Sequence, residues 1–371
     1  MGQQMARYNL DRGARLYSRN KRIEAIEKWK VALNQVRRAS DKFSALAYLI
    51  SASAQLNHPF QMLEYAQQQR NIAEMLDCAV KDAYANFNLA VARYYLGENR
   101  WCVRRVETLL ERDAPKDTRL TVDCHLFAAR SLLALGEFDA CIRHLYEARI
   151  IRNKQEIELQ IHIILGDLLI ELRDYEKAEE HYECAKGLSE SFDVTSSKYQ
   201  RESEIRLAEV NCKFERLDEA TSIAKDALRA SMLEGDVQLE ARCLTCLGEA
   251  NRRRGDYHEA LENYEHAKRK LASNLPQDFQ KRPQQLLHRL EIKILLGKTA
   301  TLMAMRRNGC ICECKVALEL NKIILSKAEQ SDDKMTKLRC NVYLEKLYRY
   351  LSDWPAAHLC SIAAQDILQV K

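Results

Sequence analysis

Three cysteines at alternate positions are the residues of this chain that could most readily bind a metal ion. Cys310, Cys312 and Cys314 stand in the run CICEC, and thiolates are good zinc ligands. A structural zinc site needs a fourth ligand, usually as part of two separated pairs. The candidates beyond the cluster are Cys340, His358 and Cys360. Because helical residues two apart point in different directions, we interpret the cluster as buried or partly exposed thiols, with zinc binding as the alternative.

A second cysteine pair, Cys243 and Cys246, has the spacing of a zinc knuckle but falls within a predicted helix. Residues three apart share one face of a helix, so core packing is the preferred interpretation. The chain contains no phosphate-binding loop, no Gly-x-Ser-x-Gly or His-Glu-x-x-His motif, and no dinucleotide fingerprint. The sequence therefore predicts a protein that is not an enzyme and that uses neither a cofactor nor a metal.

The start of the chain could bind a membrane. N-myristoylation requires Gly2 and prefers Ser or Thr at the sixth position, where this chain has Ala6. One acyl chain anchors a protein only marginally, so a basic segment is needed as a second signal. Residues 1–40 carry a net charge of +7, against +5 for the whole chain. The basic residues nearest Gly2 are Arg7, Arg12, Arg15, Arg19, Lys21 and Arg22. They predict attraction to an acidic membrane surface, with a solvated helix face as the alternative.

These residues are set in a pattern of helical hairpins that recurs along the chain. In its clearest copy, Gly248 marks the contact of a first helix with a second, and Gly255 marks the turn. Ala260, Tyr264 and Ala267 follow on the second helix. This is the tetratricopeptide repeat (TPR) pattern. It predicts an all-α fold, a right-handed superhelical solenoid of TPR hairpins, whose concave side binds other proteins.

Small residues mark the first helix of each predicted hairpin at intervals of 34 to 49 residues. The markers are Gly13, Ala47, Ala90, Ala129, Gly166, Ala208, Gly248 and Gly297. Gly97, Gly136 and Gly255 are predicted in turns within hairpins, and Gly187 and Gly235 between hairpins, where a left-handed cap is favoured. The predicted residues of the concave face are Glu249, Arg252 and Arg253, which follow the marker Gly248.

The basic triplets at 252–254 and 268–270 lack the interleaved aromatic residues of a nucleic-acid groove, so no nucleic-acid partner is predicted. No run of about 18 apolar residues and no signal peptide occurs, and the 13 cysteines suit a reducing, cytoplasmic compartment. We predict four parts. They are a leader with the possible acylation site (1–8), an array of about seven repeats (9–271), a Pro-containing linker (272–288) and divergent TPR-like hairpins (289–371).

The chain resembles the rapsyn family of receptor-associated proteins of the synapse. The resemblance begins at the opening Met-Gly-Gln and continues through Gly13–Trp29. It is strongest from Arg216 to Asp256, which includes Cys243 and Cys246. It is collinear over roughly residues 1–270 and thinner beyond. Family members normally end in a Cys/His-rich RING-type zinc domain, and this chain carries no such ligand array, so zinc-dependent functions of the family are not expected here.

The resemblance implies a peripheral protein at the inner face of the postsynaptic plasma membrane, acylated at the residue that matches Gly2. It implies self-association through TPRs, clustering of nicotinic acetylcholine receptor subunits, and a link to the cytoskeleton. The receptor-contacting helical stretch of the family would fall near Cys310–Cys340. The alternative is a soluble cytoplasmic TPR adaptor that binds a partner peptide in its concave groove, as polarity or spindle-type scaffolds do.

Overall fold

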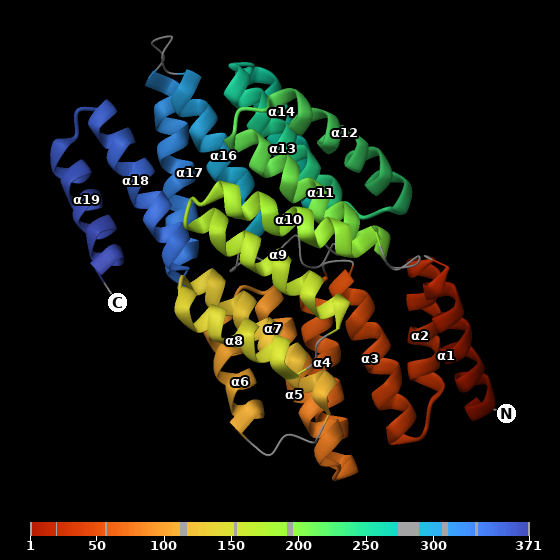
Figure 1. Ribbon diagram of the computed structural model, residues 1–371. Helices are drawn as coiled ribbons and strands as arrows, with labels where there is room; N and C mark the ends of the chain where they lie inside the picture. Colours follow the sequence, from red (N-terminus) through yellow and green to blue (C-terminus); the bar gives the residue numbers. More distant parts are fainter. Residues whose placement is uncertain are drawn as a thin grey trace. The chain divides into compact units, whose positions relative to one another are not determined.

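The computed structural model describes nine stretches of the chain: residues 2–19, 21–55, 58–111, 117–151, 154–190, 196–273, 289–305, 311–330 and 333–369. Within these stretches the chain forms helices joined by turns and contains no strand, so the predicted all-α class is confirmed (Figure 1). The chain divides into two compact units, Met1–Ser131 and Leu132–Lys371, here called unit 1 and unit 2. Each unit is described by itself.

Unit 1 is built of helices that pack in consecutive hairpins. Its helices are α1 (Gly2–Ser18), α2 (Arg22–Gln35), α3 (Ala39–Gln55), α4 (Pro59–Leu76), α5 (Ala79–Tyr95), α6 (Asn99–Glu111) and most of α7 (Thr118–Leu135). The first hairpin, α1 with α2, packs against α3 through a core of Ala25, Trp29, Leu49 and Ala52. The indole N–H of Trp29 donates to the carbonyl of Leu10 at 3.2 Å, which satisfies its one polar atom.

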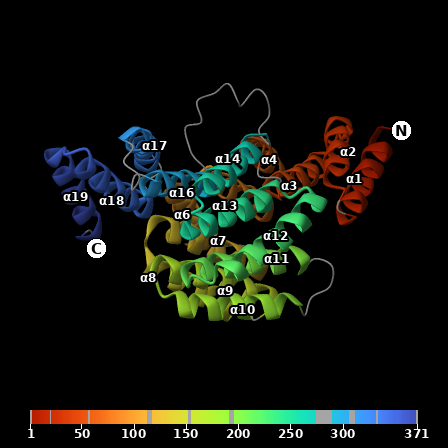
Figure 2. The same cartoon turned by 90° about the horizontal axis from the view of Figure 1, so that it is seen from above.

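Unit 2 continues the same construction. After the end of α7 it contains α8 (Phe138–Ile151), α9 (Gln155–Glu171), α10 (Tyr175–Glu190), α11 (Ser196–Lys213), α12 (Leu217–Glu234), α13 (Val237–Arg254), α14 (Tyr257–Ser273), α16 (Arg289–Met305), α17 (Ile311–Gln330), α18 (Lys334–Tyr350) and α19 (Trp354–Gln369). The first helices of its hairpins are α9, α11, α13, α16 and α18. Neighbouring first helices contact one another directly, α11 with α13 and α13 with α16 (Figures 1 and 2).

Glycine markers let the two helices of a hairpin approach closely. A Cβ atom on Gly166 would lie 2.4 Å from the ring of Tyr182, and one on Gly248 would lie 2.9 Å from the ring of Tyr264. The buried rings of these tyrosines fill the space that the missing side chains leave. This close approach explains why the sequence repeats a small residue on the first helix and an aromatic residue on the second.

The turn glycines lie where the sequence places them, with one exception. Gly97, Gly136 and Gly255 follow first helices with φ of 83°, 77° and 97°, and Gly235 caps α12 with φ of 68°. These left-handed conformations favour glycine. The prediction for Gly187 was wrong, because this residue lies inside α10. The helix continues past it since the next turn still buries Ser189 against the core.

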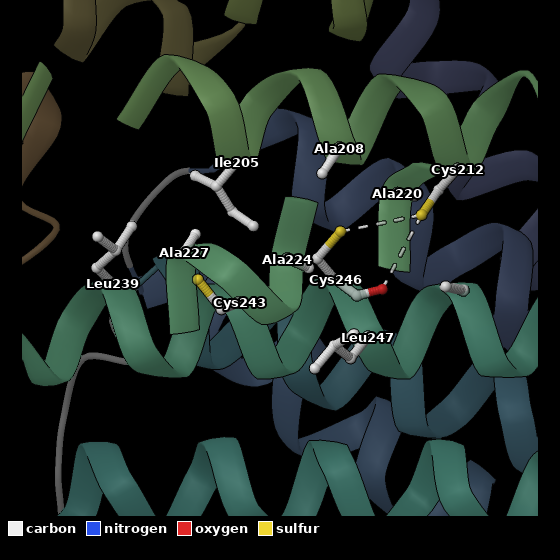
Figure 3. Packing of buried hydrophobic residues seen from close by; sticks show 11 residues of the cluster. Ile205, Ala208, Cys212, Ala220, Ala224, Ala227, Leu239, Cys243, Cys246 and Leu247 are labelled. Carbon is white, nitrogen blue, oxygen red and sulfur yellow. Dashed lines mark hydrogen bonds between the residues drawn. The ribbon is translucent and has the colours of Figure 1, made fainter. Parts of the chain in front are cut away.

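The cysteines of α13 lie in the core of unit 2. Eleven buried residues of α11, α12 and α13 form one cluster, and ten of them are labelled in Figure 3. Cys243 and Cys246 both belong to it, as their spacing on one helix face predicted. The Sγ atoms of Cys212 and Cys246 lie 3.9 Å apart (Figure 3). Burial raises the pKa of Cys243 to about 12, so this thiol stays protonated and inert at neutral pH.

The predicted division of the chain into four parts stays a prediction. The residues predicted as a leader form the first turns of α1, from Gly2 onward. Most of the predicted linker, residues 274–288, lies outside the described residues. Beyond it, Leu290 and Ile294 of α16 join the core around Tyr264, so the C-terminal hairpins extend the stack of unit 2. No described helix is both long and apolar enough to span a membrane.

Candidate functional site

Two surfaces carry the residues that the sequence singled out, and the first is on α1. Ala6, Asn9 and Gly13 are buried on one face of this helix. An adjacent face exposes Met5, Tyr8, Arg12 and Arg15, here called the α1 stripe. These four residues follow one another at intervals of three and four, so they lie along a single line of the helix. The apolar end of the α1 stripe is the end nearest Gly2, the first residue of the helix.

The other predicted basic residues near Gly2 do not all join the α1 stripe. Arg7 points toward α3, where its Nε lies 3.5 Å from the carboxylate of Asp41. Arg19 and Lys21 are exposed beyond the end of α1, and Lys21 forms an ion pair with Glu24 at 3.2 Å. The side chain of Arg22 lies outside the described residues. The structure therefore brings two of the six basic residues, Arg12 and Arg15, onto the α1 stripe.

The second surface is formed by the first helices α9, α11, α13 and α16 of unit 2. A group of charged side chains, here called the charged ladder, joins α11 to α9, to α13 and to α16. Its members are Asp167, Glu202, Arg206, Glu209, Arg242 and Lys293. Arg206 donates two hydrogen bonds to Asp167, at 2.9 and 3.1 Å, and Arg242 donates two to Glu209, at 3.0 and 3.1 Å. Such two-point pairs have defined geometry as well as charge attraction.

Asp167 and Glu209 of the charged ladder are ionised at neutral pH. Burial opposes ionisation of Asp167, but the charge and hydrogen bonds of Arg206 outweigh it and lower the pKa of this carboxyl to about 2. Burial likewise opposes ionisation of Glu209, and Arg242 together with Lys293 holds its pKa below the ordinary value. The hydroxyl of Tyr182 donates to Asp167 at 2.8 Å. With three carboxylates and three cations, the ladder is electrically balanced.

Next to the ladder lies a group with a surplus of positive charge, here called the cationic cluster: Lys213, Glu249, Arg252 and Arg253. Arg252 donates to both oxygens of Glu249, at 2.7 and 2.9 Å, and Arg253 donates to one at 2.9 Å. Lys213 of α11 reaches the same carboxylate at 3.4 Å. Burial raises the pKa of Glu249, but the three cations outweigh it and hold this pKa below its ordinary range.

The structure thus brings together Glu249, Arg252 and Arg253, which the sequence grouped because they follow Gly248. Sequence reasoning missed Lys213, which lies 36 residues away from Glu249 along the chain. Sequence reasoning also missed the charged ladder, although the sequence contains a pattern that indicates it. Asp167, Glu209 and Glu249 each directly follow the small marker residue of their first helix, so they occupy the same register in successive hairpins.

The two described cysteines of the CICEC run, Cys312 and Cys314, do not point to one place. Cys310 lies outside the described residues. Cys314 is buried against Ala317 and Leu344 in the core of the C-terminal hairpins, whereas Cys312 is exposed. Among the residues that the structure describes, no group of three His, Cys, Asp or Glu side chains could bind a metal ion.

The fold and the two surfaces define a helical-repeat protein of the TPR type. The whole chain resembles a Rap protein solved in complex with competence and sporulation factor, with a TM-score of 0.67, 11% identity and coverage of 99% of this chain and 98% of that one. It also resembles a signal transduction ATPase with a tetratricopeptide repeat sensor from Pyrococcus horikoshii, with a TM-score of 0.53, 11% identity and coverage of 99% and 53%. At such identities these similarities establish the fold alone.

The sequence matches are to proteins of the rapsyn family. Residues 1–79 match the family model described as the rapsyn N-terminal myristoylation and linker region. The 43 kDa receptor-associated protein of the synapse from Tetronarce californica is 26% identical over 271 residues, which cover 71% of this chain. The match covers 66% of that relative, so this chain spans just under two thirds of its length. The predicted resemblance to the rapsyn family is confirmed.

Proposed function

We propose that this protein is a membrane-apposed scaffold that self-associates and clusters nicotinic acetylcholine-type receptors at the postsynaptic membrane, linking them to the cytoskeleton. The observation that carries the proposal is the match of residues 1–79 to the rapsyn myristoylation and linker region, in a chain whose Gly2 is the first residue of α1. The matched relative is by name a receptor-associated protein of the synapse. Stacked helical hairpins supply the extended surface that a scaffold needs.

The α1 stripe supports membrane contact. An acyl chain on Gly2 would hold the start of α1 at the bilayer, where Met5 and Tyr8 enter the boundary between headgroups and acyl chains. Arg12 and Arg15 then meet anionic headgroups, each contributing about 1 kcal/mol. Since one acyl chain alone gives only marginal binding, these contacts act as the second signal.

Clustering follows from confinement at the membrane. Weak contacts between repeats, and between repeats and receptors, gain strength when all partners are held in two dimensions at high effective concentration. No single contact then needs high affinity. The scaffold is expected to lose clustering when it leaves the membrane, even if every protein-binding surface is intact.

The test is to express the wild-type chain and the Gly2→Ala variant together with receptor subunits and to image both proteins. We expect wild-type protein at the plasma membrane with clustered receptors, and diffuse Gly2→Ala protein with dispersed receptors. A wild-type chain that stays diffuse and leaves receptors unclustered would overturn the proposal. The soluble adaptor that binds a partner peptide would then be favoured, since the charged surface of the first helices does not depend on a membrane.

A further inference from the structure

Charge is unevenly compensated on the first helices of unit 2. The charged ladder pairs three carboxylates with three cations. In the cationic cluster, by contrast, Glu249 is the only carboxylate that contacts Lys213, Arg252 and Arg253 in the described ion pairs. The cluster therefore carries a net charge of +2, and it lies directly beside a balanced row.

This surplus charge is partly removed from water. The side chains of Lys213, Arg252 and Arg253 are 31%, 23% and 24% exposed. Charges held in such a setting without full compensation are unfavourable, and an anionic ligand would relieve the cost. The same limited exposure makes each charge–charge contact stronger than it would be at a fully exposed site.

The cations of the cluster retain donors that a ligand could use. A guanidinium has five N–H donors and an ammonium has three. Arg253 uses its Nε for Glu249, and Lys213 contacts the same oxygen at 3.4 Å. The hydroxyl of Tyr264 lies 3.5 Å from the other oxygen of Glu249. Guanidinium forks match carboxylates in planar geometry.

We propose that the cationic cluster binds carboxylate side chains of an acidic peptide segment in a partner protein. The inference rests on the proposed scaffold function, which requires a protein-binding surface, and it names the chemistry of the bound partner. A side chain from a peptide can reach these partly covered groups on α11 and α13. The flat surface of a bilayer cannot approach them as closely, so a protein segment is favoured over anionic lipid.

The experiment uses the purified full chain and fluorescently labelled peptides. A Glu-rich peptide is compared with the same peptide carrying Gln at every Glu position, and binding is followed by fluorescence anisotropy at two salt concentrations. We expect the Glu-rich peptide to bind, the Gln peptide to bind at least about tenfold more weakly, and added salt to weaken the Glu-rich complex. Equal binding of the two peptides would overturn the inference.

Substitutions test whether the peptide binds at the cationic cluster. The double variant Arg252→Gln with Arg253→Gln is expected to bind the Glu-rich peptide about tenfold or more weakly than wild type does. Arg229→Gln on α12 is the matched control, because Arg229 is 75% exposed and pairs only with Asp226 in the described contacts. Glu249→Gln raises the net charge of the cluster by one and is expected to tighten binding several-fold. Circular dichroism and melting curves establish that each variant is folded.

The outcomes separate this inference from the proposed function. If the double variant binds the Glu-rich peptide as wild type does, the cluster is not the binding site. If it instead loses binding to phosphatidylserine vesicles and keeps the peptide, the ligand is a lipid surface and the inference is wrong. Neither result bears on receptor clustering, which the Gly2→Ala comparison tests in cells.

Discussion

At the scale of single residues, the hairpins depend on glycines that stand against aromatic rings. Gly13 faces Trp29, Gly166 faces Tyr182 and Gly248 faces Tyr264, and in each case an added Cβ would lie within 2.9 Å of the ring. The rings are buried, so they cannot swing into solvent without losing their packing. The sequence predicts these positions, because the small and aromatic residues recur at a constant spacing within each hairpin.

Gly166→Ala is therefore expected to destabilise the protein. The new methyl group would lie 2.4 Å from the Tyr182 ring, and overpacking of this kind costs about 1–3 kcal/mol. Gly187→Ala is the control, since Gly187 lies inside α10 with no atom within 4 Å of the added Cβ. It should raise stability by up to about 1 kcal/mol, because alanine favours helix. Chemical unfolding measures both, and equal stability of the two variants would contradict the packing argument.

A histidine pair predicts how stability changes with pH. The Nδ1 atoms of His162 on α9 and His181 on α10 lie 2.8 Å apart. Burial lowers the pKa of both rings, and His181 lowers that of His162 further, against an opposing effect of Glu158. The unfolded chain therefore binds protons first, near the ordinary pKa of 6.5. Stability should be full above about pH 6.5 and decrease as the pH falls below it.

Melting temperatures between pH 8 and pH 5 measure this effect. Wild-type protein should lose stability across that range, and His162→Gln should show a smaller loss, because one proton fewer is taken up on unfolding. His258 lies on α14, away from this pair, so His258→Gln is the control variant. A His162→Gln curve that parallels wild type would show that the pair does not control the acid response.

At the scale of elements, one face of α1 combines apolar and basic residues. Met5 and Tyr8 are 54% and 53% exposed, a high fraction for large apolar side chains. The adjacent face, with Ala6, Asn9 and Gly13, is buried within unit 1, whereas the face with Met5 and Tyr8 is available to a second surface. The sequence predicted the basic residues but not which of them lie on the α1 stripe. Arg7 forms an ion pair with Asp41 of α3, and only the folded structure shows this.

Reversing the charge of the α1 stripe should weaken membrane binding. The double change Arg12→Glu with Arg15→Glu removes two attractive contacts of about 1 kcal/mol each and adds repulsion, so we expect at least about a tenfold loss on vesicles with anionic lipid. Arg37→Glu with Arg38→Glu alters the net charge equally at exposed positions between α2 and α3. Vesicle sedimentation compares the pairs, and equal losses would mean that net charge, not the α1 stripe, determines binding.

At the scale of each unit, unit 2 makes contacts that bring its last hairpins back to its first. Arg339 of α18 forms an ion pair with Glu171 at the end of α9. Met335, also on α18, lies 3.6 Å from the position of a Cβ on Gly136, in the turn after α7. The first helices of unit 2 therefore form a series whose end contacts its beginning. No local pattern predicts such contacts, because they depend on the accumulated rotation from hairpin to hairpin.

The sequence alone determined the helical-repeat class, the register of the hairpins, the turn glycines and the rapsyn resemblance. These features are local, since small, aromatic and turn residues act within a single hairpin. Only the tertiary structure decided which charges meet. Lys213 reaches Glu249 and Arg206 reaches Asp167 from the neighbouring hairpin, 36 and 39 residues away. Such pairs depend on how each hairpin is offset from the next. Because the repeat length varies from 34 to 49 residues, the sequence does not define this offset, and the packing between hairpins determines it.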